Sequence, residues 1–285
     1  QMTDIRQAIK DKKRIVIKIG SSSIIHEETH SIDYIKLEKL VRFICDLKNQ
    51  NKDVILVSSG AIGVGAKTIG LTQKPNTTSM KQACAAIGQG QLMMIYQKLF
   101  SEYQHSAAQV LLTFDVITSE ERRTNSINTF NELLQLGAIP IVNENDTVAT
   151  EEIEFGDNDT LSAIVAALTH ADLLVLMSDI DGLYTDDPRS NPEAKLIHIV
   201  EEVTDEIKEM AKGASTSLGT GGMSTKIAAA SIASLSGIDM VIMNGEKIST
   251  LVDLFAGEEI GTIFLSRKLK NFSLKKYIKE KQYLL

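Results

Sequence analysis

Residues 14–22 read RIVIKIGSS, and this stretch decides the fold class. After Arg14 comes a run of β-branched residues with a single lysine, Lys18, and the run stops at Gly20. A continuous apolar run of this length predicts a strand that is buried on both faces. The next segment, residues 33–49, has its apolar residues at helical spacing, so the chain is expected to continue as an amphipathic helix.

The same alternation of short apolar runs and longer helical segments continues along the chain. Further strands are expected at 53–57, 109–113, 138–142, 172–177, 238–243 and 262–265. Further helices are expected at 79–100, 119–136, 159–169, 200–212 and 224–236. Continuous apolar strands that alternate with helices are typical of a parallel sheet covered on both faces. We therefore predict an α/β fold, a three-layer sandwich with a mostly parallel central sheet.

The charge balance argues against a protein whose main surface coats nucleic acid. The 285 residues contain 30 Lys and Arg against 37 Asp and Glu, a net charge of −7. The stretch 267–281 is different, with seven basic residues and one acid. We expect one domain over 1–265 and a basic tail over 266–285. Only Phe272 and Tyr277 could stack on bases there, so the tail is expected to be a solvated helix or unstructured, and no nucleic-acid partner is expected.

Cysteine usage and hydropathy favour a cytoplasmic protein. Cys45 and Cys84 share no CxxC spacing and fall in predicted helices, where buried free thiols are the ordinary outcome. No apolar stretch of about 18 residues occurs, so no membrane span is expected. The first residues, QMTDIRQAIKDKK, have no apolar segment of the kind found in secretory signals.

In parallel α/β sheets, ligands bind at the carboxyl ends of the strands, so the loops that follow the predicted strands are the first candidates for a binding site. Lys18 lies one residue before the first predicted strand ends, and burying a lysine is costly unless it meets an anion. One interpretation is a phosphate-binding lysine, helped by the backbone amides of Gly20 and Ser21. The other is a lysine at the sheet edge that extends into solvent.

Two glycine-rich segments are candidate anion sites. Residues 57–65 read VSSGAIGVG and match neither the dinucleotide fingerprint nor the P-loop, so an anion-accepting turn and a plain tight turn both stay open. Residues 219–226 read GTGGMSTK and lead directly into a predicted helix. Amides at a helix N-terminus together with Lys226 make this the strongest phosphate signal in the chain.

An acidic and amide-rich region, NENDTVATEEIEFGDND, spans residues 143–159. It could bind metal, orient lysines or hold the amino group of a substrate, or it could be a solvated loop. Its last residues, Asn158 and Asp159, also suit a helix cap. Residues 26–30 match the zinc-protease pattern HExxH, but they lie in an expected loop or hairpin, whereas that pattern needs a regular helix.

Taken together, these loops resemble the amino acid kinase family, and within it the branch that phosphorylates glutamate. The matching segments share their order and spacing with the family over roughly residues 14–265. They are VIKIGSS (16–22), VSSGAIGVG (57–65), KQ (81–82), AIGQ (86–89), VNENDTVAT (142–150), FGDNDTLSA (155–163), SDIDGLYTDDPRSNP (178–192) and GTGGMSTK (219–226).

The resemblance implies a transferase that uses ATP and Mg²⁺ to phosphorylate the γ-carboxylate of L-glutamate, the first step of proline biosynthesis. It implies that Lys18 and Lys226 stabilise the transferred phosphate and that Asp157 holds the two lysines in position. The implied glutamate-binding residues are Ser59, Gly60, Asp146 and Asn158. The implied ATP-binding residues are Lys18, Gly20, Ser178, Asp179, Thr220, Gly221, Gly222, Met223, Ser224, Thr225 and Lys226.

Regulation and assembly are also expectations from the resemblance. Members of the family are commonly inhibited by proline, and a homo-oligomer is expected. Many bacterial members carry an extra C-terminal RNA-binding-like domain, and we expect this chain to be of the form without it. Two alternatives stay open: a related kinase that acts on N-acetylglutamate, aspartate or a nucleoside monophosphate, and a catalytically silent nucleotide sensor.

Overall fold

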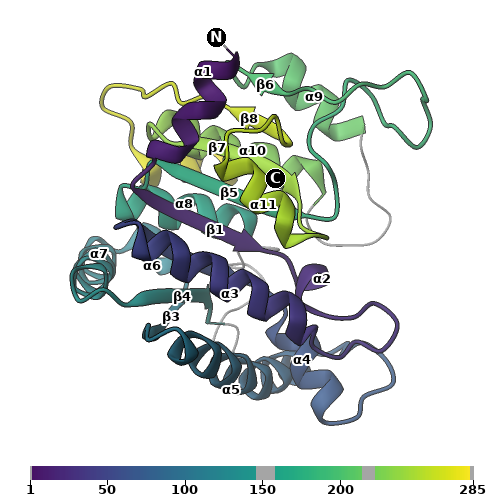
Figure 1. Cartoon of the computed structure of the whole chain (residues 1–285), viewed down its shortest axis with the longest axis vertical. Coiled ribbons are helices and arrows are strands. Elements are labelled where there is room, and N and C mark those ends of the chain that lie inside the picture. Colours follow the sequence, from purple (N-terminus) through teal and green to yellow (C-terminus); the bar gives the residue numbers. More distant parts are fainter. Residues whose placement is uncertain (1, 146–157, 214–221, 283–285) are drawn as a thin grey trace.

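The computed structural model describes residues 2–145, 158–213 and 222–282. Within them, an eight-stranded sheet has the order β3-β4-β2-β1-β5-β7-β8-β6 (Figure 1). All neighbouring strands are parallel except β7 and β8, which are antiparallel. The strands are β1 (Arg14–Ile19), β2 (Asp53–Ser58), β3 (Ala107–Leu112), β4 (Ile139–Glu144), β5 (Leu173–Ser178), β6 (Ile199–Val200), β7 (Asp239–Asn244) and β8 (Thr262–Phe264).

Helices cover both faces of the sheet, so the predicted three-layer α/β sandwich is confirmed. One face carries α7 (Glu120–Gln135), α8 (Asp159–Thr169) and α10 (Met223–Leu235), and the other carries α3 (Tyr34–Asn49), α5 (Thr78–Glu102) and α11 (Ile248–Phe255). The shorter helices are α1 (Met2–Gln7), a 3₁₀ turn (Ala8–Asp11), α2 (Ser21–Ile24), α4 (Ala61–Thr68), α6 (Asp115–Thr118), α9 (Asp205–Gly213) and α12 (Leu274–Gln282). None of the helices in the described ranges combines the length and apolar character that crossing a membrane requires.

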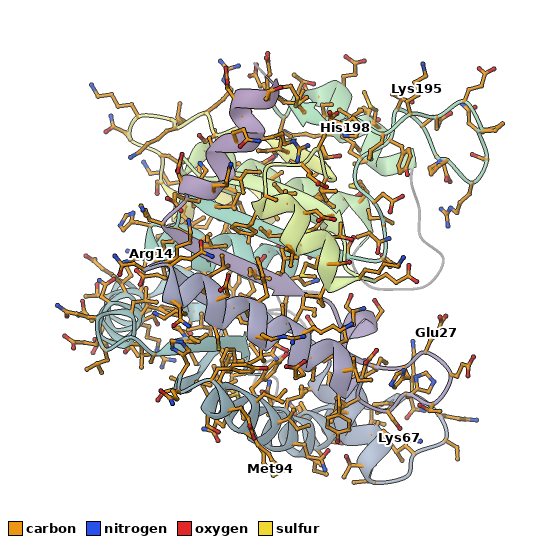
Figure 2. The ribbon with its side chains drawn as sticks, viewed as in Figure 1. Arg14, Glu27, Lys67, Met94, Lys195 and His198 are labelled. Atoms are coloured by element: carbon orange, nitrogen blue, oxygen red, sulfur yellow. The ribbon has the colours of Figure 1, made fainter. Side chains whose placement is uncertain are left out.

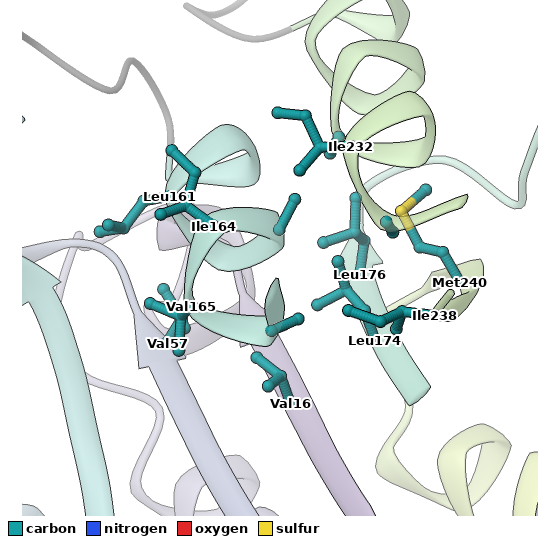
Figure 3. Close-up of a cluster of buried hydrophobic side chains, with 14 of the residues drawn as sticks. Val16, Val57, Leu161, Ile164, Val165, Leu174, Leu176, Ile232, Ile238 and Met240 are labelled. Atoms are coloured by element: carbon teal, nitrogen blue, oxygen red, sulfur yellow. The ribbon is translucent and has the colours of Figure 1, made fainter. Parts of the chain in front are cut away.

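The alternation of side chains along β1 divides the core into two layers. Ile15, Ile17 and Ile19 pack toward α3 and α5, whereas Val16 packs with the side chains of α8. Figure 3 shows this second cluster, in which α8 lies over β1, β2 and β5. Lys18 is two residues beyond Val16 and therefore points to the face that α8 and α10 cover. The strand period thus directs the one lysine of β1 toward these two helices.

Most predicted helix starts are close to the observed ones, and three of them carry side-chain caps. At the start of α5, Thr77 accepts a hydrogen bond from the backbone amide of Met80. Asp33 accepts a hydrogen bond from the backbone amide of Lys36, and Ser119 caps α7 in the same way through Arg122. The helix predicted at 200–212 begins too early. Val200 belongs to β6 and pairs with β8, so α9 begins only at Asp205.

The turn predicted within the glycine-rich segment 57–65 is shorter than expected, because α4 begins at Ala61 and only residues 59 and 60 lie between β2 and α4. Gly60 adopts a left-handed conformation with φ of 100° before the helix. Gly65 lies inside α4 against α5, where an added Cβ would be 1.8 Å from the carbonyl oxygen of Cys84. One role of glycine here is therefore to let two helices approach closely.

The basic C-terminal segment is packed rather than solvated over its described part. In α12, Ile278 is buried, and Leu274 and Tyr277 pack against the core cluster of α8 and α10. Burial also raises the pKa of Tyr277. These apolar residues recur at a spacing of three and four, which forms one stripe along the helix, while the lysines lie around it. A stripe this short was not recognised as a packing surface in the sequence.

A pair of glycines in α4 tests the close approach of α4 and α5. Gly65→Ala is expected to lower the free energy of unfolding by roughly 1–3 kcal/mol, because the new methyl group overlaps the α5 backbone. Gly63→Ala is the matched control, because no heavy atom lies within 4 Å of a Cβ at that position. The control is expected to be neutral or to stabilise the protein by up to about 1 kcal/mol. Chemical denaturation of both variants measures the difference, and equal stabilities would contradict the packing described.

Candidate active site

The site lies where the strand order changes direction. From β1 the chain moves to β2 and the strands beyond it on one side, and it later returns to β5 on the other side. At the carboxyl end of β1, Ile19 pairs with Ser58 of β2 and with Met177 of β5. Such a switch point leaves a crevice beyond the strand ends, which is the usual ligand position in open α/β sheets.

Two lysines from distant parts of the sequence meet one carboxylate at this crevice. The Nζ atom of Lys18 is 2.9 Å from Oδ1 of Asp159, and Nζ of Lys226 is 3.1 Å from Oδ2 of the same residue. Thr225 donates a further hydrogen bond of 3.0 Å from its hydroxyl group to Oδ2. Lys18, Asp159 and Lys226 therefore form one buried ion cluster, with exposed fractions of 3%, 0% and 4%.

Asp159 and Lys226 both lie in the first turn of a helix, where the helix dipole acts on their charges in opposite ways. Asp159 is the first residue of α8, where the helix dipole favours a negative charge. Lys226 is in the first turn of α10, where the dipole disfavours a positive charge. Burying a lysine at such a position is costly unless anions compensate it, and Asp159 does so here. The same arrangement, with amides and ammonium groups converging, suits binding of phosphate oxygens.

The acid between the lysines was expected to be Asp157. Asp157 lies outside the described residues, and the carboxylate found between the lysines is Asp159. The sequence places Asp159 in the acidic region that could orient lysines, and at a position that also suits a helix cap. The predicted helix bounds of 159–169 match α8, so the helix start alone does not choose between the two aspartates. The packing of α8 beside β1 and α10 is what brings the side chain of Asp159 to both lysines.

A second polar cluster lies at the carboxyl ends of β2 and β4. One of its members, Asn158, directly precedes Asp159 of the ion cluster in the sequence. Nδ2 of Asn158 donates to Oδ1 of Asn143 at 2.7 Å and to Oγ of Ser59 at 3.2 Å. Asn158 is buried and left-handed, with φ of 73°, a conformation that asparagine tolerates better than most residues. Asn143 in turn accepts from the amide of Glu144. Ser59 and Asn158, both predicted site residues, are therefore in direct contact.

The remaining predicted residues are distributed around the crevice. Gly20 lies beside Lys18, since its added Cβ would be 3.7 Å from Nζ. Ser178 ends β5, and its hydroxyl is bonded to the backbone of Ile180, whereas Asp179 is exposed. Gly222, Met223, Ser224 and Thr225 open α10. Besides Asp157, three predicted residues lie outside the described part of the chain: Asp146, Thr220 and Gly221.

The HExxH match at 26–30 is not helical. It forms the tip of a hairpin closed by an antiparallel bridge between Ile25 and Ile32. Figure 2 shows Glu27 at the edge of the molecule with its side chain directed outward. The pattern therefore lacks the helix that places both histidines on one side of a metal ion.

Comparison with known proteins agrees with this geometry. The family model described as "Amino acid kinase family" matches residues 13–244. The chain belongs to the amino acid kinase family.

Relatives in this family are similar over almost the whole chain. The chain is 52% identical to "Glutamate 5-kinase" of Clostridium perfringens over 268 residues, which are 93% of this chain and 99% of that protein. It is 52% identical to "Glutamate 5-kinase" of Carboxydothermus hydrogenoformans over 281 residues, covering 99% of this chain and 73% of that protein. The chain is also 46% identical to the "Glutamate 5-kinase" of Listeria monocytogenes.

Solved structures share the fold of this amino acid kinase at low identity. Carbamate kinase from Giardia lamblia bound to AMP-PNP matches with a TM-score of 0.63 and 14% identity, over 90% of this chain and 100% of that one. UMP kinase from Ureaplasma parvum matches with a TM-score of 0.61 and 17% identity, over 90% and 99% of the two chains. At these identities the likeness concerns the fold alone.

The ion cluster makes a prediction about stability. Asp159→Asn leaves two lysine side chains buried beside a neutral amide, so the free energy of unfolding is expected to fall by about 3–5 kcal/mol. Asp53→Asn is a matched control, because Asp53 pairs with Arg14 at 3.0 Å but both side chains are about one-third exposed. This variant is expected to lose at most about 1 kcal/mol. Urea denaturation measures the free energy of unfolding of both variants. An equal decrease in the two would contradict the larger contribution expected of the buried ion cluster.

Proposed function

We propose that this chain is a glutamate 5-kinase, an enzyme that transfers the γ-phosphoryl group of ATP to the γ-carboxylate of L-glutamate. The observation that carries the proposal is the buried cluster of Lys18, Asp159 and Lys226 beside the polar cluster of Ser59, Asn143 and Asn158. The first cluster suits the phosphates and the second suits a polar acceptor. The 52% identity to glutamate 5-kinases over nearly the full chain supports glutamate as that acceptor.

The chemistry requires charge stabilisation rather than a base. A glutamate carboxylate has a reference pKa near 4.3 and is already a nucleophile at neutral pH. One of its oxygens forms a bond to the γ-phosphorus, the bond from that phosphorus to the β–γ bridging oxygen breaks, and ADP leaves with the electron pair. Repulsion between the carboxylate and the triphosphate is the main obstacle, and phosphoryl transfer depends mostly on positioning and electrostatics. The ammonium groups of Lys18 and Lys226 would supply positive charge at this point.

The proposed residue roles rest on the positions of the described residues and, for Thr220 and Gly221, on the resemblance of the sequence to the family. Gly20 and the residues that open α10, Gly222 to Thr225, would present backbone amides to phosphate oxygens. Ser178, Asp179, Thr220 and Gly221 complete the proposed ATP site. Mg²⁺ would be bound mainly through phosphate oxygens and water, as is usual for this ion in kinases. Within the described ranges, no group of three or more His, Cys, Asp or Glu side chains could hold a metal ion.

The proposed acceptor site consists of Ser59, Gly60 and Asn158, together with Asp146 and Asp157. Ser59 and Asn158 offer hydrogen-bonding groups at the ends of β2 and α8. Carboxylates at 146 and 157 would hold the α-amino group of glutamate. The free amino group distinguishes glutamate from N-acetylglutamate, which is the acceptor in the nearest alternative reaction. Asp159 takes the role of orienting the two lysines.

The wider setting belongs to the same proposal. The product, L-glutamyl 5-phosphate, is a reactive acyl phosphate that the next enzyme of proline biosynthesis would reduce. Proline would then be the natural feedback inhibitor. We also propose that the enzyme works in the cytoplasm as a homo-oligomer.

A panel of acceptors tests the function. ADP release is measured with L-glutamate, N-acetylglutamate, aspartate and UMP, and hydroxylamine traps any acyl phosphate as a hydroxamate. Turnover is expected with L-glutamate, at least about tenfold above the other acceptors, because a correctly paired polar group distinguishes acceptors by about this factor or more. Preference for another acceptor would reassign the substrate. ATP binding without turnover of any acceptor would favour the nucleotide sensor.

The proposed catalytic roles of Lys18 and Lys226 can be tested separately from their contribution to folding. Lys18→Ala and Lys226→Ala are each expected to lower kcat by about 100-fold or more, because each removes a preorganised cation from the transition state. Lys52→Ala is the control: Lys52 is buried too, but it donates to the backbone carbonyls of Lys10 and Lys12. That variant is expected to lose stability while kcat per folded enzyme stays near the wild-type value. Wild-type turnover in either lysine variant of the site would contradict the assigned roles.

A further inference from the structure

Helix α5 contacts the turn that carries the proposed acceptor residues, although none of its own residues belongs to the site. The hydroxyl oxygen of Tyr96 lies 2.8 Å from Oγ of Ser58, and both groups are buried. Burial raises the pKa of Tyr96 to about 12, so its phenol stays neutral and can donate a hydrogen bond at any ordinary pH. On the outer side of the same helix, Met94 is exposed (Figure 2).

Ser58 transmits this contact to the turn. It is the last residue of β2, and its hydroxyl oxygen is 3.4 Å from the carbonyl oxygen of Ser59, which can only accept. Because a serine hydroxyl has one proton, donation to Ser59 leaves Tyr96 as the donor to Ser58. The carbonyl of Ser58 also faces Nδ2 of Asn158 at 3.5 Å. The orientation of Ser58 therefore bears on both Ser59 and Asn158.

Helix α5 makes a second contact at Gly88, about two helical turns before Tyr96. This contact is with Ala61, at the end of the 58–61 turn opposite to Ser58. Gly88 lies against Ala61, the first residue of α4, and an added Cβ would be 1.7 Å from the carbonyl oxygen of Ala61. Ala61 directly follows Gly60, whose left-handed conformation ends the turn. The two contacts of α5 thus enclose residues 58–61, one at Ser58 and one at Ala61.

We propose that α5 positions the acceptor-binding turn of residues 58–61, with Tyr96 as a positioning residue that acts through Ser58 and Gly88 as the contact that seats Ala61. The inference rests on the proposed function, because it assigns this turn to the phosphoryl acceptor. The lysines on the nucleotide side are oriented by Asp159 instead. Loosening α5 therefore affects acceptor binding in preference to ATP binding.

The first experiment removes only the hydroxyl group. Tyr96→Phe is expected to raise KM for glutamate about fivefold, the size expected for one buried neutral hydrogen bond, and to leave KM for ATP within twofold of wild type. A purely structural role would lower the amount of active enzyme and leave both KM values unchanged. Ser58→Ala is expected to raise KM for glutamate similarly. The double variant is expected to raise KM for glutamate no further than the single variant with the larger rise, because both substitutions remove the same Tyr96–Ser58 hydrogen bond.

The second experiment uses two glycines of α5. Gly88→Ala is expected to raise KM for glutamate about tenfold or more, because the methyl group pushes α4 and its turn away from the α5 backbone. Gly90→Ala is the matched control on the same helix, since no heavy atom lies within 4 Å of a Cβ there. It is expected to keep wild-type values of KM and kcat.

The outcomes separate this inference from the proposed function. Wild-type turnover on the acceptor panel decides the function, and the ratios of KM between variants and wild type are measured on whichever acceptor the wild type prefers. A rise in KM for the acceptor alone, in Tyr96→Phe and Gly88→Ala but not in Gly90→Ala, supports the positioning role. The positioning role would be overturned by an unchanged acceptor KM in Tyr96→Phe or by an equal rise in KM for ATP. Equal effects of Gly88→Ala and Gly90→Ala on the acceptor KM would also overturn it.

Discussion

The contact between Asp159 and two buried lysines is the constraint on which the site depends. An ammonium group in the interior is stable only near a compensating charge, so Lys18 and Lys226 both require the same carboxylate. That requirement places demands on three elements at once. β1 must turn Lys18 toward α8, α8 must begin at Asp159, and α10 must bring Lys226 to the same point. Misplacing any of them would leave a charge buried without a partner.

The two sides of the crevice are held by different physical means. On the proposed nucleotide side, ion pairs and helix dipoles define the geometry. On the proposed acceptor side, close packing of α4 on α5 and one buried hydroxyl pair set the position of the turn. Repulsion between closely packed atoms rises sharply as their distance shortens, so small changes in α5 displace the turn of residues 58–61.

The parallel sheet explains why residues so far apart in sequence meet. All strand ends that carry site residues, those of β1, β2, β4 and β5, lie at one edge of the sheet, and the helices that follow return on its faces. The change of strand order at β1 separates the loops on either side and opens the crevice. The same fold in a carbamate kinase and in UMP kinases at 14–17% identity indicates that the arrangement tolerates extensive sequence change.

By itself, the sequence determined the fold class, most element positions and the candidate loops. Apolar period and helix caps are local properties, and RIVIKIGSS, VSSGAIGVG and GTGGMSTK could be recognised without any contact information. Only the tertiary structure decided which acid joins the lysines, that Gly65 and Gly88 serve helix packing, and that Tyr96 reaches Ser58. Each of these depends on how two elements pack against each other: α8 against β1 and α10, α4 against α5, and α5 against the end of β2. Such contacts result from the packing of the whole core, and no local pattern encodes them.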